Sequence, residues 1–113
     1  MAAELSVAAL RAEIDQIDEV LVRLLDSRTR CAYAIGRVKR TEGTPVYEPG
    51  REASVLAHVR AVNQTLGGPL DDEAIARLFE RIIDESRRIQ RLEAARVDDT
   101  GDGAASASTG RGE

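Results

Sequence analysis

The first forty residues carry an apolar stripe that is longer than a domain of this size is wide. Apolar residues recur there at steps of four and three: Leu10, Ile14, Ile17, Leu21 and Leu24, then Cys31, Ile35 and Val38. This spacing is typical of one helix face packed against another helix. A helix from about Val7 to Arg40, with Ser6 as its N-cap, would be about 50 Å long. A compact domain of this length is only about 25–30 Å across, so we expect a second copy of the chain to cover the rest of the stripe.

Two further helices are predicted after the first. Thr41–Gly50 holds two prolines and two glycines and is expected to be a loop. Pro49 suits the first turn of a second helix, over roughly Gly50–Gln64. Asp71 is the predicted N-cap of a third helix that ends near Ala95. Because no strand pattern is present, the predicted fold is all-α, with three helices per chain in a homodimeric bundle.

The chain divides into a helical domain, residues 1–96, and a polar C-terminal tail, residues 97–113. The tail has one apolar side chain larger than alanine, so it cannot bury enough surface to order itself, and we predict that it is disordered. Its four acids and one base give a net charge of −3, which leaves −1 of the whole-chain −4 for the domain. Such a domain has no basic field for nucleic acid or for a membrane surface.

The cysteine and histidine content excludes several kinds of site. Cys31 is the only cysteine and His58 the only histidine, so neither a disulfide framework nor a Cys/His metal cluster is expected. The N-terminus resembles no secretory signal, and no apolar run is long enough for a membrane span. The sequence therefore predicts a cytoplasmic protein.

Polar residues interrupt the apolar faces of the first and third helices. Arg28 stands about five turns after Leu10, where the stripe calls for an apolar residue, and Lys39 is about 20° off the same line. Ser86 and Gln90, four residues apart, occupy two positions where the third helix calls for apolar residues. Two cations on a buried face need anionic partners, because a buried unpaired charge is costly.

Residues elsewhere extend this polar set. Arg51 and Glu52 open the second helix beside the loop. A pocket for a small anion would satisfy all of these groups. Arg11 lies about 25 Å along the first helix from Arg28 and about 100° around it, so it cannot reach the same pocket in its own chain. An antiparallel partner helix could bring it there, which predicts a site shared between subunits.

Each of these residues also has a purely structural interpretation. Arg28 could pair with an acid across a dimer, Lys39 could reach solvent or cap carbonyl groups, and Arg11 could be a solvated surface residue. Ser86 and Gln90 could form hydrogen bonds between helices. No nucleophile–base pair and no metal-ligand spacing can be assembled from the sequence. The combination, rather than any single residue, favours a site.

Four blocks of the sequence, and the spacing between them, resemble the all-helical chorismate mutases. The blocks are LRAEIDQIDEVLVRLLDSR, IGRVK, PVYEPGRE and LFERIIDESRRIQ, and the resemblance covers about Leu5 to Leu92. It implies an intertwined dimer with two equivalent sites, each completed by one arginine of the other chain. The implied activity is the rearrangement of chorismate to prephenate in aromatic amino acid biosynthesis, with no cofactor and no metal.

The resemblance also implies a role for individual residues. Arg28 and Arg51 match the arginines that bind the substrate carboxylates, and Arg11 matches the arginine supplied by the partner. Lys39 matches a lysine that contacts a carboxylate and the ether oxygen. With Gln90 it is predicted to stabilise the charge that grows on that oxygen, and Arg28 completes the predicted catalytic set.

The remaining implied contacts lie at the ring end of the substrate. Glu52 matches the acid that holds the ring hydroxyl, and Ser86 matches a further polar contact. Glu48 stands where many relatives have aspartate, and Gly50 also departs from the usual block.

Three alternatives stay open. The first is a sister enzyme on the same scaffold, an isochorismate-pyruvate lyase or a 4-amino-4-deoxychorismate mutase. The second is a weakly active regulatory subunit that partners a shikimate-pathway enzyme. The third is a plain helical dimerisation module, which would explain the long helix but not Lys39 or Gln90.

Overall fold

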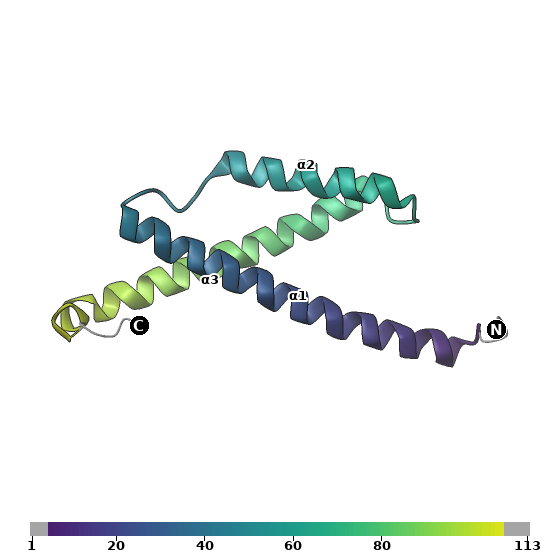
Figure 1. Ribbon diagram of the computed structural model, residues 1–113, viewed down its shortest axis with the longest axis horizontal. Coiled ribbons are helices and arrows are strands. Elements are labelled where there is room, and N and C mark those ends of the chain that lie inside the picture. Colours follow the sequence, from purple (N-terminus) through teal and green to yellow (C-terminus); the bar gives the residue numbers. More distant parts are fainter. Residues whose placement is uncertain (1–4, 108–113) are drawn as a thin grey trace.

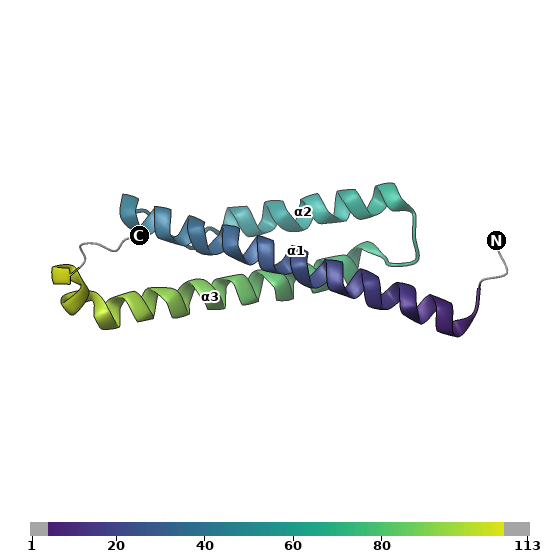
Figure 2. The same cartoon turned by 60° about the horizontal axis from the view of Figure 1, so that its bottom comes forward.

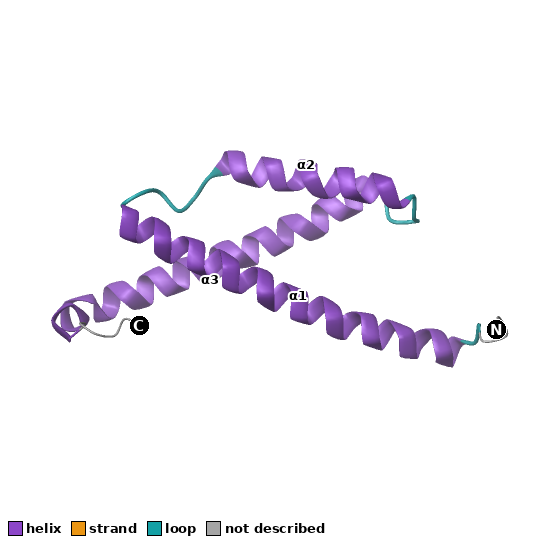
Figure 3. Ribbon diagram, viewed as in Figure 1, coloured by secondary structure: helices purple, strands orange, loops and turns teal. Residues whose placement is uncertain are grey.

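The computed structural model describes residues 5–107, with side chains for residues 5–97, and consists of three α-helices (Figure 1). Helix α1 spans Val7–Glu42, α2 spans Pro49–Leu66 and α3 spans Asp72–Ala107. No strand occurs within the described residues (Figure 3). The predicted all-α class and the order of three helices are confirmed.

Local signals in the sequence set where the helices begin. The Ser6 side chain accepts a hydrogen bond from the Ala9 N–H at 3.0 Å, and Asp71 Oδ1 accepts one from the Ala74 N–H at 2.8 Å. Both contacts satisfy a backbone donor that has no partner inside its own helix. Pro49 occupies the first turn of α2, where its missing N–H costs no hydrogen bond. Both predicted N-caps are therefore confirmed.

Glycine sets where α1 and α2 end. Gly43 has φ 76° and Gly67 has φ 61°, both in the left-handed region that glycine enters without steric cost. The Gly43 N–H bonds to the carbonyl of Arg40, which closes the last turn of α1. Each helix thus ends two residues beyond its predicted end.

Helix α3 is longer than the sequence predicts. Its end is expected near Ala95, but the helix continues to Ala107, so the predicted boundary after residue 96 falls inside it. Backbone hydrogen bonds can continue a helix through a stretch that has no apolar periodicity. The disorder predicted for residues 97–113 stays a prediction, and residues 108–113 lie outside the described part of the chain.

Helix α3 packs against both other helices. Figures 1 and 2 show that α1 crosses α3 near the middle of the molecule, while its N-terminal half extends away from both other helices. The molecule measures 65 × 30 × 16 Å and has a radius of gyration of 19.4 Å. A compact domain of this length would have a radius of gyration of about 13 Å. One chain is therefore an open, elongated unit.

The apolar stripe of α1 stays largely uncovered in the single chain. Its first five members are between 44% and 60% exposed: Leu10, Ile14, Ile17, Leu21 and Leu24. Buried apolar residues lie instead on α3, at Ala76 and Ile83. Among the described helices, none combines the length and the hydropathy that a membrane span requires. The exposed stripe is what the sequence predicts for a helix that a second chain covers.

Candidate active site

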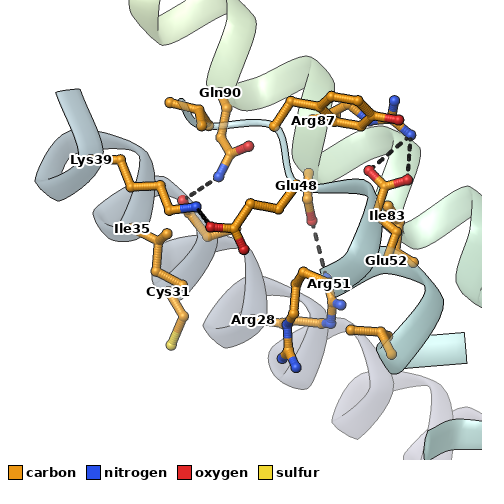
Figure 4. Close-up of a pocket in the computed structure, with 15 residues that line it drawn as sticks. Arg28, Cys31, Ile35, Lys39, Glu48, Arg51, Glu52, Ile83, Arg87 and Gln90 are labelled. Atoms are coloured by element: carbon orange, nitrogen blue, oxygen red, sulfur yellow. Dashed lines mark hydrogen bonds and ion pairs between the residues drawn. The ribbon is translucent and has the colours of Figure 1, made fainter. Parts of the chain in front are cut away.

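One cavity of about 320 Å³ opens where α1, the loop before α2, the first turn of α2 and α3 meet (Figure 4). Seven of the eight candidate residues line it: Arg28, Lys39, Glu48, Arg51, Glu52, Ser86 and Gln90. Apolar side chains, among them Ile35, Val55 and Ile83, complete the wall. The structure therefore brings together side chains that are up to 62 positions apart in the sequence, from Arg28 to Gln90.

The crossing of α1 and α3 supplies one side of the cavity. Arg28 and Lys39 are about three turns apart on α1, and Ser86 and Gln90 are one turn apart on α3, so each pair shares a helix face. Arg28 donates a hydrogen bond to Ser86 Oγ at 3.2 Å, which joins the two helices directly. The polar residues that interrupt the two apolar faces thus meet one another.

The first turn of α2 supplies the opposite side. The carbonyl of Glu48, the residue before α2, accepts the N–H of Arg51 at 3.0 Å and of Glu52 at 3.3 Å. These bonds hold the turn in which both side chains reach the cavity. Pro49 suits the turn because its φ is already close to the helical value.

Positive charge exceeds negative charge around the cavity. Its lining holds four cations and two carboxylates, a net charge of +2: Arg28, Lys39, Arg51 and Arg87 against Glu48 and Glu52. Lys39 forms an ion pair with Glu48, and Arg87 pairs with Glu52 at 3.2 Å. Among the side chains that the structure describes, neither Arg28 nor Arg51 has an ion-pair partner. Two guanidinium groups are thus available for an anion.

The two predicted donors for the ether oxygen already have intrachain partners. Gln90 Nε2 donates to the carbonyl of Ala32 at 2.6 Å, and the Lys39 ammonium pairs with Glu48 (Figure 4). Lys39 keeps only 18% of its side chain exposed. A ligand in the cavity would therefore exchange these contacts for its own.

Arg11 lies outside this cavity. It is exposed, on the part of α1 that the other two helices leave uncovered. Because Arg11 and Arg28 share one continuous helix, they are about 25 Å apart along its axis. Its contribution to a partner's site stays a prediction.

Arg87 and Tyr47 line the cavity although the sequence analysis does not single them out. The Arg87 guanidinium lies 5.0 Å from the centroid of the Tyr47 ring, a cation–π distance, and also pairs with Glu52. Arg87 is one residue from Ser86, about 100° around α3, so it lies at the edge of the inward face. At such a position the sequence alone cannot separate a site residue from a solvated arginine.

Metal ligands do not gather in the described part of the chain. Its side chains include no group of three or more histidine, cysteine, aspartate or glutamate residues placed to hold a metal ion.

The fold and the cavity define a class of small all-helical proteins with a cationic, helix-lined pocket. Residues 10–91 match the model of the family chorismate mutase type II, and the chain belongs to that family. The match covers both sides of the cavity, from α1 through α2 to Gln90 on α3.

Known relatives agree with this membership. The chain is 43% identical over 88 residues to the bifunctional chorismate mutase/prephenate dehydratase of Pseudomonas aeruginosa, which covers 74% of this chain but only 23% of that protein. It is 32% identical over 87 residues to the 4-amino-4-deoxychorismate mutase of Streptomyces venezuelae, covering 77% of this chain and 82% of that one. The solved structure of the chorismate mutase (Form II) from Thermus thermophilus superposes with a TM-score of 0.70 at 38% identity. That alignment covers 75% of this chain and 93% of the Thermus chain.

Proposed function

We propose that this chain converts chorismate to prephenate, as an isomerase of aromatic amino acid biosynthesis. The observation that carries the proposal is that Arg28 and Arg51, which have no ion-pair partner among the described side chains, line one cavity with Lys39 and Gln90. Chorismate has two carboxylates, and arginine binds carboxylates with two parallel hydrogen bonds. The cavity lining has a net charge of +2, which would balance the two negative charges of chorismate.

The chemistry of the reaction suits these residues. In this one-substrate rearrangement a C–O bond breaks as a C–C bond forms, so it needs no nucleophile, no general base and no cofactor. The protein can hold the enolpyruvyl side chain folded over the ring, in a conformation close to that of the transition state. It can also place donors where negative charge grows on the ether oxygen. Lys39 and Gln90 take this second role, after exchanging Glu48 and the Ala32 carbonyl for the substrate.

Glu48, Glu52 and Ser86 contact the ring end of the substrate. Glu52 accepts a hydrogen bond from the ring hydroxyl. Glu48, the residue before α2, lines the same cavity. Ser86 already bonds to Arg28 and adds a polar contact beside the carboxylate. The family resemblance implies these roles, and the shared cavity supports them.

The working unit is an intertwined homodimer in which Arg11 of each chain completes the site of the other. The exposed stripe of α1 supports this, because burying the exposed half of each leucine or isoleucine would contribute about 1 kcal/mol. Arg11 lies on this same half of α1. The dimer would place it against a second chain rather than in solvent.

A 4-amino-4-deoxychorismate mutase is the second candidate, because the Streptomyces relative has that name. The amino group of such a substrate would favour a carboxylate that is free to pair with it. Glu52, the acid assigned to the ring end, already has a cationic partner in Arg87 at 3.2 Å. This neutralisation favours the hydroxyl group of chorismate over an ammonium group.

The deciding experiment follows the loss of chorismate absorbance with purified protein and quantifies prephenate. It is repeated with isochorismate and with 4-amino-4-deoxychorismate. Rapid formation of prephenate would support the proposal, whereas turnover of an analogue alone would assign a sister enzyme. No turnover of any of the three substrates would indicate a regulatory subunit that needs a shikimate-pathway partner. Because the Gln90 amide is neutral, we expect kcat to vary little from about pH 5 to about pH 9.

The proposed compartment is the cytoplasm. Cys31 is an exposed free thiol in the cavity wall, and the cytoplasm keeps such thiols reduced.

A further inference from the structure

A buried carboxylate lies on α3 one turn beyond Gln90, outside the cavity. Glu93 is only 6% exposed, although burying a carboxylate is costly unless it is paired. It forms an ion pair with Arg40 and accepts a hydrogen bond from the Tyr33 hydroxyl at 3.2 Å. Arg96, on the same helix, adds a third contact at 3.4 Å. The proposed reaction gives this carboxylate no role.

The partners of Glu93 on α1 flank the place where Gln90 rests. Tyr33 and Arg40 are seven residues apart, about 10 Å along the helix. Gly36, which is buried, lies between them. A Cβ atom at position 36 would be 3.4 Å from Gln90 Cγ and 3.5 Å from a guanidinium nitrogen of Arg40. The side chains of Gln90 and Arg40 therefore lie next to each other over the bare backbone of Gly36.

The Gln90 side chain also bonds to this segment of α1, the one that contains Tyr33 and Arg40. Its amide donates to the carbonyl of Ala32, the residue directly before Tyr33. Lys39, the other proposed donor, directly precedes Arg40 in the chain and lies near Gln90 in the cavity wall (Figure 4). The Gln90 amide thus bonds to the segment of α1 that Glu93 holds at two points.

We infer that Glu93 is a positioning residue, which through Tyr33 and Arg40 fixes α1 against α3 and so aims the Gln90 amide. The inference rests on the proposed function for its kinetic consequence, but not for its geometry. A carboxylate is well suited to this task because its two oxygens contact the two α1 partners separately, Oε2 the tyrosine and Oε1 the arginine. A leucine at this position could pack against α1 but could not set the register of the crossing through directional bonds.

The kinetic test compares Glu93→Gln with Glu85→Gln, alone and combined with Gln90→Ala. Glu85 is a matched control because it is a glutamate of α3 that pairs with Arg81 and Arg88, and its partners all lie on α3. We expect Glu93→Gln to lower kcat about tenfold with KM changed less than about twofold, since a small misplacement of a donor weakens the transition state most. With Gln90 already replaced by alanine, Glu93→Gln should cost no further activity. An equal loss in both backgrounds would overturn the inference, because it would reveal a general loss of structure.

A second readout needs no turnover. The side-chain amide of Gln90 gives nuclear magnetic resonance signals whose position and hydrogen exchange report its bond to the Ala32 carbonyl. Glu93→Gln should move these signals and speed their exchange, Tyr33→Phe should move them less, and Glu85→Gln should leave them in place. Unmoved signals in a folded Glu93→Gln or Tyr33→Phe protein would overturn the inference. This holds even if the wild-type protein fails to convert chorismate, a result that would reject the proposed function alone.

Discussion

The two halves of α1 are suited to different neighbours. The inner half, residues 26–42, meets α3 of its own chain through polar contacts that include Arg28 to Ser86 and Arg40 to Glu93. The outer half, residues 7–25, carries an apolar stripe that is about half exposed. Both halves have the same helical geometry and follow one another without a break. The difference lies in the polar residues that the inner half adds to the shared face, where Ile35 and Val38 are also about half exposed.

This difference separates two physical tasks. Apolar burial is non-directional and grows with area, so the outer half can associate with any complementary apolar face. Hydrogen bonds and ion pairs are directional, and each left unmade in a buried place is costly, so the inner half accepts only one arrangement of α3. The outer half therefore suits assembly, and the inner half suits the placing of a small charged ligand.

The largest effect is expected from breaking the outer half. Leu21→Glu would place a charge in the middle of the apolar stripe and remove a leucine whose exposed half contributes about 1 kcal/mol per chain when buried. We expect sedimentation to report a fall from twice the chain mass of 12.2 kDa to once that mass, with loss of turnover. Val22→Glu is the matched control, because Val22 is adjacent, 65% exposed and outside the stripe. A Leu21→Glu protein that stays dimeric and active would refute the assignment of the stripe to assembly.

The next effect comes from the inner half. Lys39→Ala removes a donor from the ether oxygen, and we expect kcat to fall by about 10²- to 10³-fold. The melting temperature should change little, since the ion pair that is lost is with Glu48, which is 52% exposed. Arg37→Ala, an exposed cation in the same turn of α1, should keep its activity. A plain dimerisation module would instead make the two variants indistinguishable in every assay.

A smaller effect is expected from mixed dimers, which combine a variant of the outer half of α1 with a variant of the inner half. Arg11→Ala and Lys39→Ala chains should each form inactive dimers, because every site then lacks one group. In a mixed dimer, the Arg11→Ala chain would receive the intact Arg11 of its partner and regain one complete site. Random mixing should therefore restore about one quarter of the wild-type activity. Co-expression with two affinity tags isolates the mixed dimer, and no recovery in it would mean that Arg11 does not act across the interface.

The sequence could predict the fold because its signals are local. The Ser6 and Asp71 caps and the stretch containing Pro49 each set a helix start without reference to distant residues. The end of α3 escaped prediction because it depends on backbone hydrogen bonds in a stretch with no apolar pattern.

The candidate site could be predicted only where polar residues interrupt an apolar face. Arg28 and Gln90 stand at such positions, and the structure brings both to one cavity. Arg87 is offset from the face, and its pair with Glu52 joins positions 35 apart that no periodicity connects. Glu93 follows Gln90 on the same face, but near a helix end a glutamate resembles a solvated charge until its tyrosine and arginine partners are known.

The smallest effect concerns the turn between α2 and α3, which is stabilised within one chain like the inner half of α1. The side-chain amides of Gln64 and Asn63 donate to the Asp72 carboxylate at 2.7 Å and 3.0 Å. The Gln64 bond, followed by the Asn63 bond, holds the pKa of Asp72 below its ordinary value of 3.8. Because the folded pKa is the lower one, the stabilisation is fully present above the unfolded pKa and is lost as the pH falls through the folded pKa.

Replacement of this carboxylate tests that sign. Asp72→Asn should unfold at a lower urea concentration than the wild type at about pH 6, and the difference should disappear towards about pH 2. Glu73→Gln removes a neighbouring charge whose contact with Arg60 is an exposed pair at 3.6 Å, so it should change the urea midpoint little at any pH. If the Asp72→Asn difference instead grew as the pH fell, the amide bonds could not be its cause.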